Sequence, residues 1–223
     1  MAHRFETAVA MLPARLRRPR GHQKHYEPTS VSLQYEQRRV TGRDVISLPE
    51  ADAVDPVERD GVLDLDSVSR LLQLSFGLNR RRSDEDSAIR RWTPTGGNLG
   101  SPQAYLSCAG LPGLPDGRWF FDAGSRSLIR LRASGTTAAR GVDLTVVCEV
   151  SRVWSKYNIF GYRIVHLDTG AALASLRSTA AAHGIGLANH RAWDDSALED
   201  EFGIDVKEQI VTAHLHISGG RHA

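Results

Sequence analysis

The sequence has few of the features that mark secreted, membrane or metal-binding proteins. Its two cysteines, Cys108 and Cys148, lie far apart in apolar, strand-like contexts, so they fit neither a disulfide framework nor a metal motif. The longest apolar runs, such as 144–148, are too short to span a bilayer. The apolar stretch near the start is followed by arginines, the reverse of a secretory signal. We therefore expect a cytoplasmic protein with no membrane contact, whose cysteines are buried free thiols.

The composition is that of an ordinary globular domain with an unusual beginning. Of the 223 residues, 41% are hydrophobic and 24% charged, as in soluble proteins. The net charge of +2 is unevenly spread, because residues 1–43 carry about +6. We expect a basic N-terminal arm over 1–43 and one domain over 44–223. The arm lacks interleaved aromatic residues, so a solvated or dimer-embracing arm is expected rather than nucleic-acid binding.

Hydrophobic periodicity predicts an α+β order of elements. A helix is expected over 64–76, capped by Asp64 or Asp66 and ended by Gly77 in a left-handed conformation. Strands are expected over 45–49, 103–109, 118–122, 127–131, 142–150 and 209–217, and further helices over 163–183 and 195–202. The long helix has a small-residue face that permits close packing. This order suits a sheet with helices packed on it.

A glycine-rich loop between Pro94 and Pro102 is the first candidate site. Gly96 and Gly97 allow a ligand to approach the backbone N–H groups closely, and Thr95 and Asn98 offer side-chain hydrogen bonds. The loop lacks the ending of a P-loop and the dinucleotide fingerprint. It could hold a flavin ring edge or a phosphate, or simply connect two elements.

Three smaller features could carry chemistry. Lys156 and Tyr157 can act as a proton-abstracting pair if burial lowers the lysine pKa; the alternative is a surface lysine beside a half-buried tyrosine. Arg221 follows two glycines and is either a phosphate clamp or part of a frayed end. His214 and His216 alternate on one strand face, but a third ligand is missing, so we expect no metal.

The order and spacing of these motifs resemble the SagB-type dehydrogenases of the nitroreductase-like superfamily. The stretch from Arg90 to Leu106 is similar to the family's glycine loop and the strand after it. The family's later motifs are a Gly-Leu-Pro turn, an aromatic pair, a Lys-Tyr dyad, a Tyr/Phe-Arg pair and a helix beginning Asp/Glu-x-Gly-His. Their counterparts here are Gly113-Leu114-Pro115, Trp119 to Asp122, Lys156-Tyr157, Tyr162-Arg163 and Asp168 to Ala171. The resemblance covers residues 44–217.

The resemblance implies a nitroreductase-like α+β fold, with a mostly antiparallel central sheet flanked by helices. Two chains, identical or related, would pair and build FMN sites across their interface. Pro94, Thr95, Gly96, Gly97 and Asn98 would surround the isoalloxazine. Lys156 and Tyr157 match the positions proposed for the proton step in azoline oxidation, after which oxygen would reoxidise the flavin. The substrate would be a ribosomally made peptide, and the partner a cyclodehydratase complex.

The sequence departs from the family at three places. The N-terminal arginine segment that holds the FMN phosphate in many relatives is missing, and Arg90, Arg91 or Arg221 would have to replace it. The family has a histidine at the start of the long helix, where this sequence has Ala171. The family's Pro-x-Gly-Gly-Phe segment is replaced by Ala-Asn-His-Arg-Ala-Trp at 188–193. Three functions therefore stay open: an FMN-dependent peptide dehydrogenase, an NAD(P)H-dependent nitroreductase, and a flavin-free scaffold or partner subunit.

Overall fold

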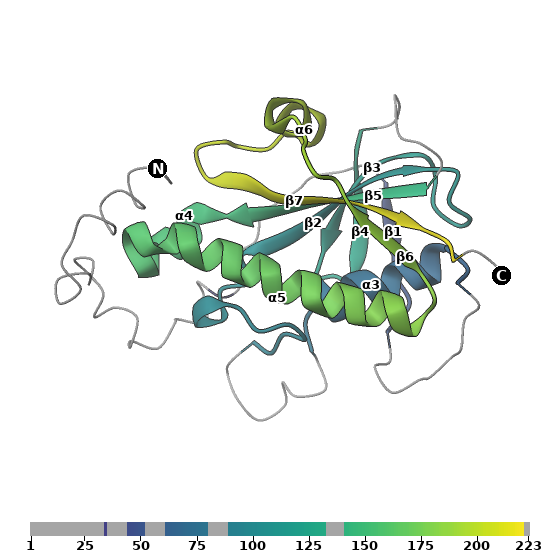
Figure 1. Cartoon of the computed structure of the whole chain (residues 1–223), viewed down its shortest axis with the longest axis horizontal. Helices are drawn as coiled ribbons and strands as arrows, with labels where there is room; N and C mark the ends of the chain where they lie inside the picture. Colours follow the sequence, from purple (N-terminus) through teal and green to yellow (C-terminus); the bar gives the residue numbers. More distant parts are fainter. Residues whose placement is uncertain (1–33, 35–43, 52–60, 80–88, 133–140, 221–223) are drawn as a thin grey trace.

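The computed structural model describes residues 34, 44–51, 61–79, 89–132 and 141–220 (Figure 1). Apart from Gln34, the expected basic arm lies outside the described residues. Arg221 lies outside them as well. No helix among the described residues is long and apolar enough to cross a membrane.

The described residues form a central seven-stranded sheet in the order β1-β4-β3-β2-β5-β7-β6. Its strands are β1 (Val45–Ser47), β2 (Pro102–Ala109), β3 (Gly117–Asp122), β4 (Ser127–Arg132), β5 (Gly141–Glu149), β6 (Gly186–Asn189) and β7 (Gln209–Ser218). Every pair of neighbouring strands is antiparallel. The expected α+β fold class is therefore confirmed.

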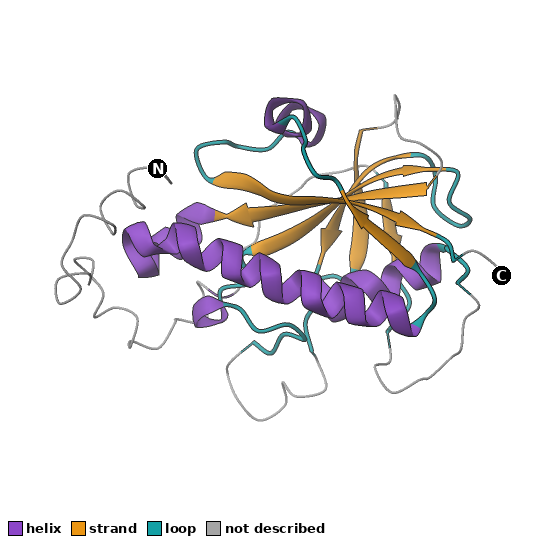
Figure 2. Cartoon of the chain, in the orientation of Figure 1, coloured by secondary structure: helices purple, strands orange, loops and turns teal. Residues whose placement is uncertain are grey.

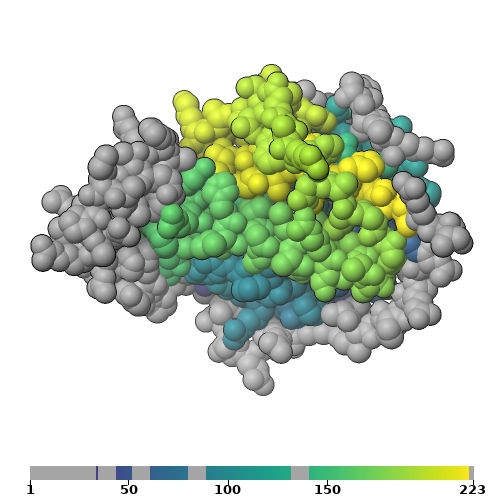
Figure 3. All heavy atoms as spheres, viewed as in Figure 1, coloured from purple at the N-terminus to yellow at the C-terminus, as the bar shows by residue number. Residues whose placement is uncertain are grey.

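Helices cover both faces of the sheet (Figure 2). Within the described ranges the helices are α3 (Leu65–Phe76), α4 (Val150–Tyr157), α5 (Gly161–Ala182) and α6 (Asp195–Phe202), with two short 3-10 turns, η4 (Gly96–Asn98) and η5 (Asn158–Phe160). Helices α3 and α5 pack together on one face, and α6 lies over the other. Side chains of α5 form the middle of the surface seen in Figure 3.

Two of the three apolar clusters among the described residues lie between the sheet and the helices on its two faces. The larger lies between the sheet and helices α3 and α5, and includes Leu72, Trp119 and Leu176. The smaller joins Tyr105 and Phe120 of the opposite face to Phe202 of α6. Alternation along the strands produces this division, because successive side chains point to opposite faces.

Capping residues mark the ends of helices α3 and α6. Asp64 caps α3 by accepting a hydrogen bond from the N–H of Ser67 at 2.8 Å, and Gly203 ends α6 in the left-handed region with φ 64. Gly77 ends α3 as expected, but the left-handed conformation expected for it was wrong, because its φ is −87. A Cβ atom there would lie 2.4 Å from the carbonyl oxygen of Gln73, so close packing on α3 explains this glycine.

Two elements were not expected from the sequence. The predicted strand 142–150 ends at Glu149, and the next residues form helix α4. The four-residue strand β6 pairs with β7 at the edge of the sheet. Both cysteines are buried free thiols, as expected.

Candidate active site

The glycine loop is a tight turn that its sequence makes possible. Gly97, Asn98 and Gly100 have φ values of 61, 59 and 63, in the left-handed region that favours glycine and asparagine. Within the loop, the N–H of Asn98 donates to the carbonyl of Thr95 at 2.9 Å. The N–H of Gly100 donates to the Thr95 hydroxyl at 2.9 Å. The residues expected to bind a ligand thus also hold the loop in shape.

A buried carboxylate fastens the loop to helix α5. Asp168 accepts a hydrogen bond from the N–H of Gly96 at 2.7 Å and from the hydroxyl of Ser101 at 2.5 Å. Burial raises the pKa of Asp168, while the two hydrogen bonds and the charge of Arg91 oppose that rise. This anchor could not be predicted from the sequence, apart from an Asp at the start of a family motif, because its contacts join distant segments.

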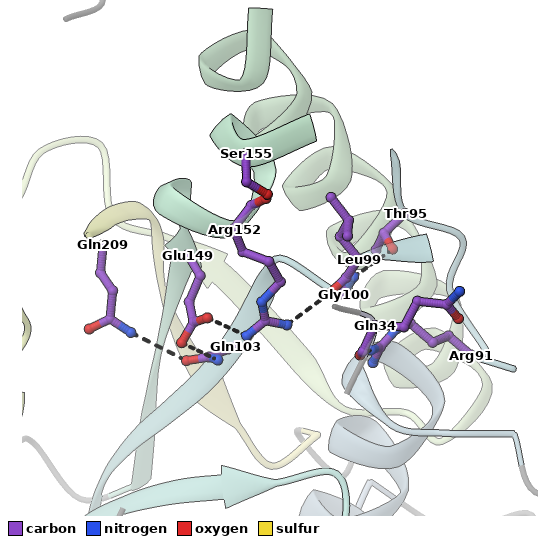
Figure 4. A network of polar contacts seen from close by, with 10 residues as sticks. All are labelled: Gln34, Arg91, Thr95, Leu99, Gly100, Gln103, Glu149, Arg152, Ser155 and Gln209. Carbon is purple, nitrogen blue, oxygen red and sulfur yellow. Dashed lines mark hydrogen bonds and ion pairs between the residues drawn. The ribbon is translucent and has the colours of Figure 1, made fainter. Parts of the chain in front are cut away.

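Asn98 and Arg91 are turned toward Gln34. The Asn98 amide donates to the side chain of Gln34 at 2.8 Å and to the carbonyl of Ile89. The Arg91 guanidinium donates to the Gln34 carbonyl at 2.9 Å (Figure 4). It lies so close to Gly100 that a Cβ atom there would be 2.2 Å from Cζ of Arg91. Arg90, in contrast, is exposed.

A narrow hollow opens beside the loop, between the end of α3 and the start of β2. Phe76 and Gly77 line one side, and Arg91, Thr95 and Gly100 line the other. Ser75 also lines the hollow, and its buried Oγ has no hydrogen-bond partner among the described residues. A small polar group could therefore be bound at this wall.

Lys156 and Tyr157 lie on α4, and both side chains are buried, with 9% and 8% of their surfaces exposed. The alternative of a surface lysine was therefore wrong. The Lys156 ammonium nitrogen lies 5.8 Å from the centre of the Tyr157 ring. Tyr157 belongs to a buried cluster that includes Leu99 of the glycine loop and Val165 of α5. The structure thus brings the dyad's tyrosine to the loop.

The electrostatic surroundings favour the protonated form of Tyr157. Burial, followed by the negative charge of Asp168, raises the pKa of the phenol above its usual value. At neutral pH the side chain is therefore a neutral phenol, able to donate a hydrogen bond.

His214 and His216 lie on the face of the sheet that α6 covers in part, away from the loop. His214 contacts the Thr145 hydroxyl at 3.0 Å and stacks on His190 with 4.3 Å between ring centres. His216 contacts Asp143 at 2.8 Å. Within the described ranges, no group of three or more His, Cys, Asp or Glu side chains could hold a metal ion.

Solved structures with this arrangement of elements define the fold. A proposed nitroreductase from Anabaena variabilis matches with a TM-score of 0.69 and 21% identity over 97% of this chain. A proposed nitroreductase from Ralstonia eutropha matches with a TM-score of 0.62 and 18% identity, over 83% of this chain and 93% of its own. This chain spans 45% of the Anabaena chain.

A third match is a chain of the E. coli microcin synthetase McbBCD complex with truncated pro-MccB17 bound. Its TM-score is 0.58 at 15% identity, over 97% of this chain and 86% of that chain. No protein-family model and no curated protein matches the sequence. The likeness to these solved structures shows that the chain has the nitroreductase-like fold.

Proposed function

We propose that this chain is an FMN-dependent oxidoreductase of the SagB type, which oxidises an azoline ring to an azole in a ribosomally made peptide. The observation that carries the proposal is the buried cluster in which Tyr157, the neighbour of Lys156, packs with Leu99 of the glycine loop. The likeness to a chain solved in complex with a pro-peptide supports a peptide substrate and a multi-subunit assembly.

The residues of the loop fit a flat ring on the loop's outer side. Pro94 is exposed, and Gly97 is a half-buried residue without a side chain, so a planar group can approach the backbone closely there. Arg90 is exposed whereas Arg91 is turned inward. Of these two arginines, Arg90 would therefore contact the FMN phosphate.

The dyad would divide the proton chemistry between its two members. FMN, when bound, supplies the acceptor for the hydride that leaves the ring. Because its pKa is raised, Tyr157 stays a phenol and donates a hydrogen bond to the ring. In its neutral amine form, Lys156 would then be the group that takes the Cα proton and becomes an ammonium. The ring loses one hydride and one proton, which converts an azoline to an azole.

A flavin-free partner subunit is the second candidate function, and one observation favours it. The N–H groups of Gly96, Asn98 and Leu99 all donate within the protein. The inner side of the loop is therefore satisfied without a ligand. Such a subunit would pair with a related chain in a peptide-modifying complex and would leave the redox step to that chain.

The test begins with the absorption spectrum of the purified protein. An FMN enzyme shows flavin bands and releases FMN on denaturation, and it oxidises an azoline-containing peptide with oxygen as acceptor. Protein that stays colourless and does not take up added FMN contradicts the proposal and supports the partner subunit. Consumption of NAD(P)H with a nitro compound or quinone, without peptide oxidation, identifies a nitroreductase instead.

A further inference from the structure

A buried ion pair lies where β5 ends and α4 begins. Glu149 is the last residue of β5, and Arg152 follows three residues later in the first turn of α4. Nη2 of Arg152 pairs with a carboxylate oxygen of Glu149 (Figure 4). The side chains are only 2% and 13% exposed, so solvent screens this pair much less than an exposed one.

Each member of the pair also contacts the last residues of the glycine loop. Nη1 of Arg152 donates to the carbonyl of Leu99 at 2.9 Å. The N–H of Glu149 donates to the carbonyl of Ser101 at 3.1 Å. The second carboxylate oxygen of Glu149 accepts from the Gln103 amide at 3.0 Å, and Gln103 in turn contacts Gln209 of β7. The network therefore links the loop, β2, β5 and β7.

The same helix presents the candidate catalytic dyad. Arg152 and Lys156 are four residues apart on α4, and therefore lie on one side of the helix. Helix α4 holds Leu99 in two ways, because Arg152 binds its carbonyl and the cluster of Tyr157 surrounds its side chain.

We propose that Glu149 and Arg152 are positioning residues: their buried pair fixes the carboxyl end of the glycine loop relative to the helix that carries Lys156 and Tyr157. The effect of this ion pair on catalysis rests on the function proposed above. Removing either partner leaves the other charge buried and unpaired. Removing Arg152 also leaves the Leu99 carbonyl without its donor.

The test is hydrogen exchange at the loop amides of Gly96, Asn98 and Gly100, measured without added FMN. Arg152→Met keeps an unbranched stem up to the position of Nε, and removes the guanidinium head with its charge and both hydrogen bonds. We expect these amides to exchange at least about tenfold faster than in the wild type, because charge-assisted bonds that limit local opening are lost.

The matched control is Arg118→Met, which removes another partly buried ion pair. Arg118 contacts Glu201 at 2.8 Å, with 9% and 22% of the side chains exposed, and joins β3 to α6 away from the loop. We expect this control to change the loop exchange by no more than about twofold. Glu149→Gln is a second variant, which keeps the shape of the side chain and removes its charge. If Arg152→Met does not fold, the loop exchange in Glu149→Gln tests the proposal. The proposal is wrong if the loop amides of the folded variants exchange as in the wild type, or if Arg118→Met loosens them equally.

An FMN titration followed by flavin fluorescence separates this proposal from the proposed function. If the wild type binds FMN, we expect Arg152→Met to weaken binding at least about fivefold and Arg118→Met to leave it unchanged; equal affinity in Arg152→Met contradicts the positioning role. If the wild type binds no FMN, the proposed function fails, and the exchange rates alone decide whether the pair positions the loop.

Discussion

The carboxylate of Asp168 accepts a hydrogen bond from the N–H of Gly96, 72 positions earlier in the chain, at 2.7 Å. The same carboxylate binds Ser101 at the other end of the loop. One side chain of α5 therefore closes the loop at both ends. The loop and the long helix form one structural unit, because this side chain fixes both ends of the loop.

Asp168→Ala should lower the free energy of unfolding by about 2–3 kcal/mol, because the N–H of the half-buried Gly96 and the buried hydroxyl of Ser101 lose their acceptor. Urea denaturation measures the difference. Asp194→Ala is the control: it removes an exposed carboxylate that caps α6 by accepting from the N–H of Ala197, at a cost of about 1 kcal/mol. Equal losses in the two variants would show that Asp168 does no more than an ordinary helix cap.

Gly96→Ala should destabilise the protein by about 1–3 kcal/mol, because the added Cβ would lie 2.5 Å from Cγ2 of Ile164. Gly170→Ala is the control, on helix α5, which also carries Ile164. A Cβ atom there meets nothing within 4 Å, and we expect a gain of about 0.5–1 kcal/mol from helix propensity. Adding Ile164→Ala to Gly96→Ala should make room for the methyl group, so the losses of the two single variants should not add. Thermal or urea denaturation of the four variants tests both expectations.

If the proposed function holds, Lys156→Met should reduce the rate of peptide oxidation by about 10²–10⁴-fold, because the proposed proton acceptor is lost. Flavin content should stay nearly intact in this variant and in Lys156→Ala. Tyr157→Phe should also lower kcat, and Lys207→Met, at an exposed lysine, should leave the rate unchanged. Single-turnover bleaching of the flavin bands by an azoline peptide measures the step. Full activity in Lys156→Met would remove the dyad from the mechanism.

His190→Ala should raise the pKa of His214. Burial, and then the charge of His190, lower that pKa below its usual value of 6.5, while Asp143 and Glu201 act in the opposite direction. Proton NMR titration of the imidazoles measures the shift. His166, whose pKa is lowered by burial alone, is an internal control that should not move.

The same lowered pKa has a consequence for stability, and its sign follows from proton binding. Below pH 6.5 the unfolded state binds a proton at His214 more readily than the folded state, so the free energy of unfolding falls as the pH falls. His190→Ala should make this loss smaller. A wild-type protein and a variant that lose stability equally between pH 7 and 5 would contradict the expectation.

Regular, strongly patterned elements could be predicted from the sequence, and elements defined by distant contacts could not. The helix over Leu65–Phe76 has an apolar face and a capping aspartate, and both signals are local. Helix α4 was missed because its first residues continue the valine-rich pattern of β5, and because it has only eight residues. Strand β6 has four residues and no alternation, and exists through its pairing with β7.

The residues of the candidate site fall into the same two groups, those predicted from local sequence and those defined by distant contacts. The glycine loop and the Lys156-Tyr157 pair are visible as residue types in order, so the sequence could propose them. Asp168, Glu149 and Arg152 could not be proposed, because their roles depend on hydrogen bonds between segments that folding brings together. Gly77 was correctly predicted to end its helix, but a glycine is needed there because of a close contact and not because of its backbone angle.

The deep placement of both thiols makes the protein a convenient background for site-specific labelling. Burial raises the pKa of Cys108 to about 11 and that of Cys148 to about 12, and the protonated thiol is the unreactive form. A maleimide reagent should therefore leave the native protein unmodified. A single cysteine introduced at an exposed position, such as that of Leu167 on α5, would then carry a probe or cross-linker alone and could report which chain packs beside it.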